Sequence, residues 1–245
     1  MGGGTVVLLH GLLCDEAVWA DQRSKLGAQR VAVPLFGHRT SITAMAEHVL
    51  QQVPAGHFSL AGHSMGGRVA LEVVRLAPQR VERLALLDTG LDPLPGGEAG
   101  ENERQQRMAL LQLARERGMR AMGQQWARGM VHPSRLDTPL FQAILDMIER
   151  STPDVFEAQI GALLGRPDAN PVLAGVMVPT LLMCGRQDSW SPLSRHEKMR
   201  ELLPASHLTV VENSGHMTTM EQPNAVSAAL ASWLEMRQPT IGTVG

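Results

Sequence analysis

The sequence contains no tyrosine, and its aromatic residues make up only 3% of 245 positions. A tyrosine side chain is therefore excluded as a catalytic acid, as a base or as a donor to an oxyanion. Cysteine is also scarce, because only Cys14 and Cys184 are present and they lie far apart. Two isolated cysteines provide neither a zinc-site spacing nor a disulfide framework, which predicts free thiols in a reducing compartment.

The chain also lacks an excess of charge of either sign. Lys and Arg number 22, Asp and Glu number 24, and the formal net charge is −2 at pH 7. This balance gives no electrostatic basis for binding nucleic acid or an anionic membrane. No apolar run approaches the ~18 residues that a membrane span requires. The N-terminus lacks the basic and apolar regions of a signal peptide, so we expect a cytoplasmic protein.

The residues that are present alternate between strand and helix signals at both ends of the chain. Apolar, β-branched runs predict strands at residues 5–9, 31–36, 58–61, 81–87, 178–184 and 207–211. The run at 31–36 contains Pro34, which shortens it and places it near an edge. Alternation of this kind predicts an α/β fold with a mostly parallel sheet of about six strands flanked by helices. Ligands of such sheets bind at the carboxyl ends of the strands.

The middle of the chain has a different composition. A Pro- and Gly-rich linker at 93–97 is followed by residues 101–166, which are rich in Met, Arg and Gln and show helical periodicity. This segment predicts about four helices and no strand. We therefore expect two parts: a core formed by residues 1–92 and 172–245, and an all-helical cap inserted at 93–171.

The stretch Leu60–Arg68 contains the pattern Gly62-x-Ser64-x-Gly66, which is typical of a nucleophile elbow. In that motif the serine sits on a tight turn between a strand and a helix, where only glycine fits at the two flanking positions. A strand signal precedes the pattern and an apolar helical face follows it. The context therefore favours Ser64 as a nucleophile over a simple turn residue.

A serine hydroxyl needs a base to remove its proton and an acid to orient that base. The elbow motif expects the chain order Ser, then Asp or Glu, then His. His216 follows the last predicted strand, and Asp188 follows the strand before it. Asp88 is a second candidate for the acid, because it also follows a predicted strand. We favour Asp188, since consecutive strands are usually neighbours in space.

These motifs resemble those of the α/β-hydrolase superfamily over residues 5–89 and about 175–235. The matching segments are His10–Leu12 for the oxyanion loop, Gly62–Gly67 for the elbow, Gly185–Asp188 with Pro192 for the acid turn, and Asn213–His216 with Glu221–Pro223 for the histidine loop. The resemblance implies an α/β-hydrolase fold with Ser64 as nucleophile, His216 as base and Asp188 as its orienting acid. It also implies that the backbone N–H groups of Leu12 and Met65 form an oxyanion hole.

The segment at 93–171 lies where this family inserts the variable cap that shapes the substrate pocket. We name His10, His63 and Trp126 as candidate pocket residues, and we expect Arg68 to face solvent on the elbow helix. No pair of histidines has the H-E-x-x-H spacing of a zinc site, and we expect neither a metal nor a cofactor.

The reading that fits best is a serine-dependent hydrolase of a small carboxylic ester or related acyl compound, which acts through an acyl-enzyme. Fold alone does not fix the reaction. The alternatives are a C–C bond or enol-lactone hydrolase, a thioesterase, a cofactor-free perhydrolase, and a lyase of the menaquinone-synthase type, which the Gly66–Arg68 segment resembles. A small-molecule receptor is the alternative outside enzymes. The expected partner is a small molecule, and the chain is expected to be a monomer or a homodimer.

Overall fold

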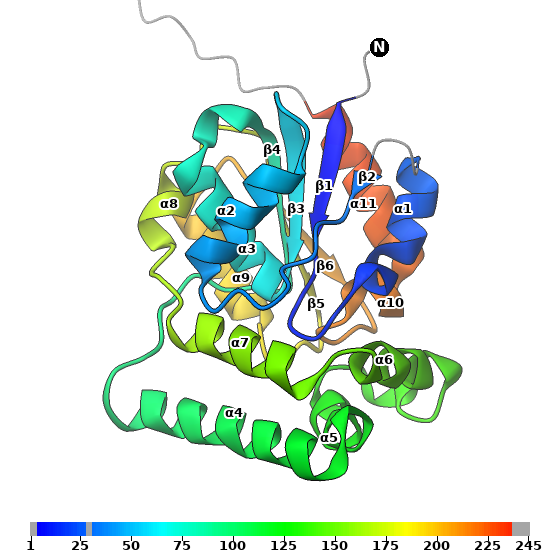
Figure 1. Cartoon of the computed structure of the whole chain (residues 1–245). Coiled ribbons are helices and arrows are strands. Elements are labelled where there is room, and N and C mark those ends of the chain that lie inside the picture. Colours follow the sequence, from blue (N-terminus) through cyan, green and yellow to red (C-terminus); the bar gives the residue numbers. More distant parts are fainter. Residues whose placement is uncertain (1–3, 28–30, 237–245) are drawn as a thin grey trace, which may run out of the picture.

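The computed structural model describes residues 4–27 and 31–236, and within these ranges six strands form one sheet (Figure 1). The strands are β1 (Thr5–Leu9), β2 (Val31–Ala32), β3 (Phe58–His63), β4 (Val81–Leu87), β5 (Thr180–Gly185) and β6 (His207–Val211). Their order is β2-β1-β3-β4-β5-β6, and every neighbouring pair is parallel. The prediction of a mostly parallel sheet of about six strands is confirmed.

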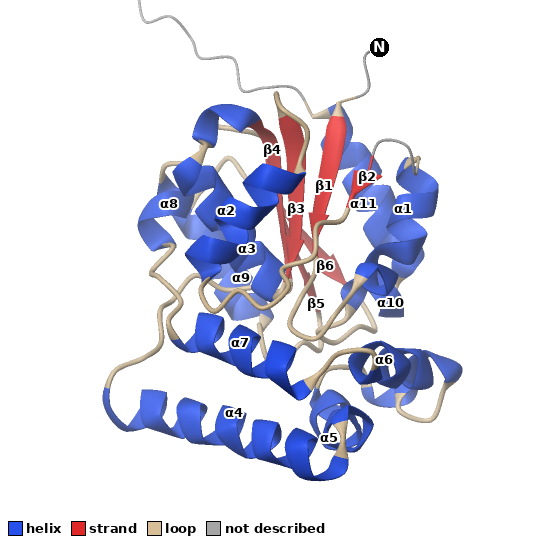
Figure 2. Ribbon diagram, in the orientation of Figure 1, coloured by secondary structure: helices blue, strands red, loops and turns tan. Residues whose placement is uncertain are grey.

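Helices cover both faces of this sheet, as Figure 2 shows. One layer consists of α2 (Ile42–Gln52), α3 (Met65–Leu76), α8 (Asn170–Ala174) and α9 (Leu193–Leu202), and the other of α1 (Ala20–Leu26), α10 (Thr218–Glu221) and α11 (Pro223–Glu235). Short 3-10 turns are present at Glu16–Trp19, Pro78–Arg80, Ala127–Gly129 and Pro133–Arg135. Because both faces are covered, central strands such as β3 and β5 are buried along their whole length.

The second strand is shorter than the sequence predicted. It ends at Ala32, two residues before Pro34, rather than at Phe36. Proline has no N–H to donate to a strand ladder, which explains why the pairing stops early. The strand does lie at the edge of the sheet, where it pairs with β1.

Four helices lie across the carboxyl ends of the strands, at the bottom of Figure 1. They are α4 (Gly97–Arg117), α5 (Met119–Trp126), α6 (Pro139–Glu149) and α7 (Pro153–Leu164). Residues 93–171 form no strand, as predicted, and we refer to α4–α7 as the helical block. The division of the chain into a core and a cap domain stays a prediction. Throughout the described ranges, no helix has both the length and the apolar character that crossing a bilayer needs.

A very close backbone approach lies where α3 meets β1 and β3. A β-carbon at Gly62 would collide with the carbonyl group of Gly66, and one at Gly66 would collide with the carbonyl group of Leu9. Both obstacles are backbone atoms, which cannot rotate away. The two glycines of the elbow pattern are therefore required by the packing of α3 against the sheet.

We predict that Gly66→Ala destabilises the protein by about 3 kcal/mol or more, because a new methyl group must displace the backbone of Leu9 and His10 at the end of β1. Gly161→Ala in α7 is the matched control. A β-carbon there has only the Thr40 carbonyl oxygen nearby, at 3.6 Å. Replacing glycine by alanine inside this helix should then raise the free energy of unfolding by ~0.5–1 kcal/mol. Chemical denaturation measures both, and equal effects of the two substitutions would contradict the packing argument.

Candidate active site

Ser64 lies between β3 and α3 with a φ of 55°, which is rare for a residue that is not glycine. Two hydrogen bonds fix this turn. The Ser64 N–H donates to the Leu87 carbonyl oxygen at 2.8 Å, and the Thr89 hydroxyl donates to the Ser64 carbonyl oxygen at 2.6 Å. Both partners belong to the neighbouring strand β4 or its continuation, since Leu87 ends the strand and Thr89 lies two residues later. The strained turn leaves the Ser64 hydroxyl partly exposed at the carboxyl end of the sheet.

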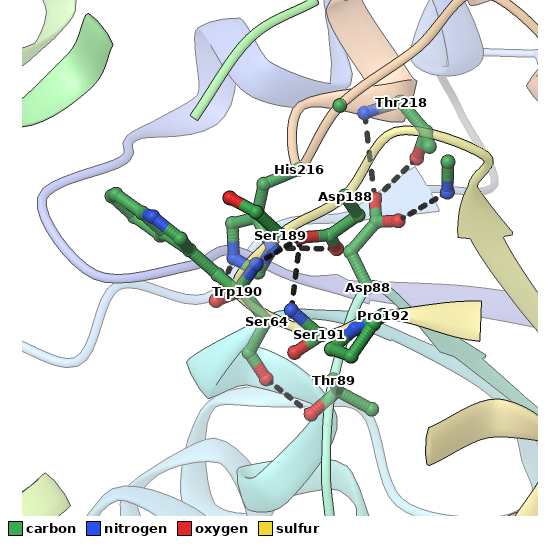
Figure 3. A network of polar contacts seen from close by, with 12 residues as sticks. Ser64, Asp88, Thr89, Asp188, Ser189, Trp190, Ser191, Pro192, His216 and Thr218 are labelled. Carbon is green, nitrogen blue, oxygen red and sulfur yellow. Dashed lines mark hydrogen bonds and ion pairs between the residues drawn. The ribbon is translucent and has the colours of Figure 1, made fainter. Parts of the chain in front are cut away.

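His216 and Asp188 lie beside this hydroxyl, as Figure 3 shows. The Ser64 Oγ atom is 2.8 Å from His216 Nε2, and His216 Nδ1 is 2.8 Å from Asp188 Oδ2. The three side chains come from the ends of β3, β5 and β6, which the sequence separates by up to 152 residues. The structure therefore brings together the three residues that the sequence predicted for a triad. Their spacing has the form that serves nucleophilic catalysis.

His216 and Asp188 each stabilise the charged form of the other. Burial by itself would lower the pKa of His216, but the charge and hydrogen bond of Asp188 outweigh it and raise that pKa above 6.5. Burial would raise the pKa of Asp188, yet the interaction with His216 and the N–H groups of Ser191 and Trp190 lower it overall. An ionised Asp188 accepts a hydrogen bond from the Nδ1–H group of His216. The Nε2 atom is then free to accept a proton from Ser64.

The second oxygen of Asp188 is held by backbone. Its Oδ1 atom accepts hydrogen bonds from Trp190 N–H at 2.8 Å and Ser191 N–H at 2.9 Å (Figure 3). These bonds fix the carboxylate on the turn after β5. They leave Oδ2 for His216.

Asp88, the other candidate acid, makes a different set of contacts. Its Oδ1 atom accepts the Gly185 N–H at 3.0 Å, and its Oδ2 atom accepts the Thr218 hydroxyl at 2.5 Å. Burial and the nearby charge of Asp188 raise its pKa well above 3.8. The contact of Asp88 with His63 is not an ion pair, because burial lowers the pKa of His63 to about 3. Asp88 thus joins β5 to the loop after His216 and makes no hydrogen bond to His216 itself.

A third buried carboxyl group, that of Glu221, holds the loop that carries His216. It accepts the N–H groups of Gly215 at 2.9 Å, Met217 at 3.2 Å and His132 at 2.7 Å. His132 belongs to the segment between α5 and α6. In the sequence, Glu221 falls within a segment that resembles a family motif, but it was given no predicted role. The motif alone could not show that its side chain connects the histidine loop to the helical block.

The residues predicted to form an oxyanion hole lie next to the serine. Met65 is the first residue of α3, so its N–H has no acceptor within the helix. Leu12 lies on the loop after β1 and lines the same cavity as Ser64 and Met65. The next residue, Leu13, has a φ of 58° and donates its N–H to Gln159 of α7 at 2.9 Å. The helical block therefore also supports the loop of Leu12. The function of the two N–H groups stays a prediction.

Ser64 opens into a cavity of about 780 Å³ between the sheet and the helical block. Apolar and aromatic side chains and several arginines share its wall. Lining residues include Gly11, Leu12, Cys14, His63, Met65, Arg68, Leu110, Trp126, Met130, Leu163, Trp190 and His216. This mixture of apolar walls and a few polar groups is typical of a small-molecule site.

The cavity corrects and extends the sequence-based list of pocket residues. Of the three candidates, His63 and Trp126 line it, whereas His10 does not. The His10 ring is buried against Phe36 at a centroid distance of 4.4 Å. Trp190 was missed, although its ring lies 5.2 Å from the rings of both His216 and Trp126. Its position two residues after Asp188, on the same turn, could have indicated that Trp190 lies near the site.

Arg68 also differs from expectation. It lines the cavity and is partly buried, so the prediction that it faces solvent was wrong. The side chain folds back from α3 because its Nη1 atom donates to the Asp92 carbonyl oxygen at 2.9 Å.

Other reactive groups near the site have limited chemistry. Cys14 lines the cavity, but burial raises the pKa of its thiol to about 12, which keeps it protonated near neutral pH. Across residues 4–27 and 31–236, no three His, Cys, Asp or Glu side chains gather where they could hold a metal ion.

Comparisons with known proteins agree with this geometry. A sequence model described as "Alpha/beta hydrolase family" matches residues 6–229. A putative esterase/lipase of Haemophilus influenzae is 26% identical over 247 residues, which cover 94% of this chain and 82% of that protein. The dihydrolipoyllysine-residue acetyltransferase component of the acetoin cleaving system of Pseudomonas putida is 27% identical over 95% of this chain, which spans 64% of that longer protein. The structure of a thermophilic esterase from Thermogutta terrifontis superposes with a TM-score of 0.81 at 26% identity, over 94% of this chain and 90% of that one.

We predict that the pKa of the His216 imidazole is raised above 6.5 in the native protein and is lower in Asp188→Asn than in the native protein. The substitution removes the charge that, together with its hydrogen bond, outweighs burial, and burial favours the neutral ring. NMR of the imidazole nitrogens as a function of pH measures this shift. Asp146→Asn is the control, because it removes an exposed carboxylate on α6. A titration of His216 that Asp188→Asn leaves unchanged would contradict the assignment of their interaction.

Proposed function

The chain belongs to the alpha/beta hydrolase family, and we propose that within it this protein is a serine hydrolase of a small carboxylic ester or a related acyl compound. The observation that carries the proposal is the pair of 2.8 Å hydrogen bonds from Ser64 through His216 to Asp188. The likeness to a putative esterase/lipase and to a thermophilic esterase supports the same reading.

The proposed reaction follows from these positions. Ser64 Oγ attacks the carbonyl carbon of the substrate while His216 Nε2 takes the hydroxyl proton, and Asp188 stabilises the resulting imidazolium. The carbonyl oxygen becomes an oxyanion that accepts hydrogen bonds from the N–H groups of Leu12 and Met65. His216 then returns the proton to the leaving oxygen, which departs and leaves the acyl group on Ser64. Water attacks this acyl-enzyme by the same steps, with His216 as base, and releases the acid.

The cavity fits a small substrate better than a polymer or a long chain. Its volume of about 780 Å³ lies within the range of small-molecule sites. Trp126 and Trp190 face each other at 5.2 Å beside His216, so they form an aromatic wall next to the reacting atoms. An acyl or alcohol group of modest size packs there.

The same three side chains also suit the cleavage of thioesters, enol-lactones and C–C bonds, or an elimination. A screen of esters, thioesters, lactones and dienoates of different lengths separates these reactions by their kcat/KM values. A small-molecule receptor would bind such compounds without turnover. We expect the highest kcat/KM for an ester, and no turnover of any compound would contradict the proposed function.

We predict that Ser64→Ala lowers kcat for p-nitrophenyl ester hydrolysis by ~10⁶-fold and leaves the melting temperature nearly unchanged. The substitution removes the nucleophile but no buried contact of the core. Ser24→Ala is the matched control, because Ser24 is exposed on α1. Residual activity of Ser64→Ala above about one per cent of the native rate would argue against Ser64 as the nucleophile.

We predict that Asp188→Asn lowers kcat by thousands-fold, because the imidazole loses the acceptor that fixes its tautomer. Asp88→Asn should lower kcat by less than about tenfold and instead reduce stability by ~1–3 kcal/mol, since it disturbs buried hydrogen bonds to Gly185 and Thr218. Steady-state kinetics and denaturation measured on both variants separate the two effects. The reverse order of kcat losses would assign the catalytic acid to Asp88.

A further inference from the structure

Four arginines line the cavity that contains Ser64. They are Arg68, Arg107, Arg166 and Arg195. They come from separate elements, since Arg68 lies on α3, Arg107 on α4 and Arg195 on α9. The rest of the wall combines apolar side chains with polar ones, among them the acidic residues Asp88, Asp92 and Glu103. A buried cation is costly without a partner, so the position of an unpaired charge depends on what each guanidinium contacts.

Two of these charges have a partner within the protein. Arg166 donates two hydrogen bonds to the Glu103 carboxylate, at 2.6 and 2.8 Å. Arg107 donates to the same carboxylate at 3.0 Å. The two arginines hold the pKa of Glu103 down at about 2 despite its partial burial. One negative charge, that of Glu103, is thus set against the two positive charges of Arg107 and Arg166.

Arg68 and Arg195 have no such partner in the described part of the chain. Arg68 donates to the backbone carbonyl oxygen of Asp92 at 2.9 Å, and Arg195 to that of Trp190 at 3.3 Å. Neither forms an ion pair with a carboxylate within the described ranges. A carbonyl oxygen satisfies one N–H but does not neutralise a guanidinium, which carries five donors.

The two guanidinium groups converge over Gly90, three residues after the end of β4. A β-carbon at Gly90 would lie 2.9 Å from Arg195 Nη1 and 3.3 Å from Arg68 Nη2. Glycine therefore leaves the space into which both side chains reach. Burial, with the charges of Arg166 and Arg195, lowers the pKa of Arg68 to about 9, and the more weakly acting carboxylates of Asp92 and Glu103 do not offset this. This part of the wall is thus a positive region that an anion would stabilise.

The pair lies close to the reacting serine. Arg68 is four residues after Ser64, one turn further along α3, which corresponds to ~6 Å along the helix axis. Arg195 lies on α9, the helix that follows the turn of Asp188. A substrate whose reactive carbonyl rests on Ser64 therefore reaches the arginines with a chain of a few atoms.

We propose that Arg68 and Arg195 form a subsite for a carboxylate group of the substrate, so that the preferred substrates are anionic esters with the carboxylate a few atoms from the cleaved bond. This inference rests on the proposed function. Guanidinium groups match the planar carboxylate and donate paired, charge-assisted hydrogen bonds to it. The carboxylate of the substrate would then form the ion pair that Arg68 and Arg195 do not form with a carboxylate of the protein.

The test compares three esters of similar size. Mono-p-nitrophenyl adipate carries a carboxylate on the acyl part, 4-carboxyphenyl hexanoate carries one on the leaving group, and p-nitrophenyl hexanoate is neutral. We expect kcat/KM of the native protein to favour one of the two anionic esters. In Arg68→Gln and in Arg195→Gln the ratio of anionic to neutral kcat/KM should fall by about 10- to 100-fold. The anionic ester that is preferred shows which side of the bond faces the subsite.

Arg200→Gln is the matched control, because it removes an exposed arginine from the same helix as Arg195. It should leave the ratio and the activity unchanged, which separates a local contact from a change in net charge. Melting temperatures identify any variant that fails to fold. If the neutral ester is hydrolysed through Ser64 but neither anionic ester is preferred, the subsite is wrong while the proposed function stands.

A second measurement does not depend on turnover. Monomethyl adipate binding to Ser64→Ala is followed by calorimetry, with methyl hexanoate as the neutral reference. We expect the anionic ester to bind more tightly, and its Kd to rise about 10- to 100-fold when Arg68→Gln is added. Equal affinity for the two compounds, or an unchanged Kd in Arg68→Gln, would overturn the subsite whatever the enzyme's activity.

Discussion

The close approach of helix α3 to strands β1 and β3 is the constraint on which the rest of the site depends. Gly62 and Gly66 permit backbone atoms to meet where any β-carbon would collide. This contact forces Ser64 to a positive φ and holds its hydroxyl above the sheet. The same approach places Met65 at the start of α3, with its N–H directed away from helical partners. One steric condition thus sets the positions of both the Ser64 hydroxyl and the Met65 N–H group.

Three carboxyl groups near His216 have different tasks because their surroundings differ. Asp188 has one oxygen held by backbone N–H groups and the other on His216, so it is the one that orients the ring. Asp88 and Glu221 are directed to N–H and hydroxyl groups of the loops and stabilise the position of the histidine segment. Because Glu221 also binds His132, the helical block helps to fix the histidine loop as well as covering the cavity.

Local patterns in the sequence predicted the features that short stretches determine. The strands, the elbow and the three residues at strand ends follow from runs of a few residues, and the parallel topology follows from their order. The wall of the cavity could not be predicted in this way. Trp190, Gln159 and the meeting of Arg68 with Arg195 over Gly90 depend on how distant helices pack. Arg68 was expected to face solvent because its position on α3 lies away from the sheet. The local sequence does not show that the helical block covers this position.

The most direct test of the account is the reaction of the native protein with a fluorophosphonate, followed by mass spectrometry of its peptides and by the rate of labelling at different pH values. The account predicts one adduct, on Ser64. It also predicts that the rate falls as the pH drops through the raised pKa of His216, above 6.5, because a protonated imidazole cannot accept the serine proton. An adduct on another residue, or a rate that stays constant between pH 5 and 8, would contradict the activation of Ser64 by His216.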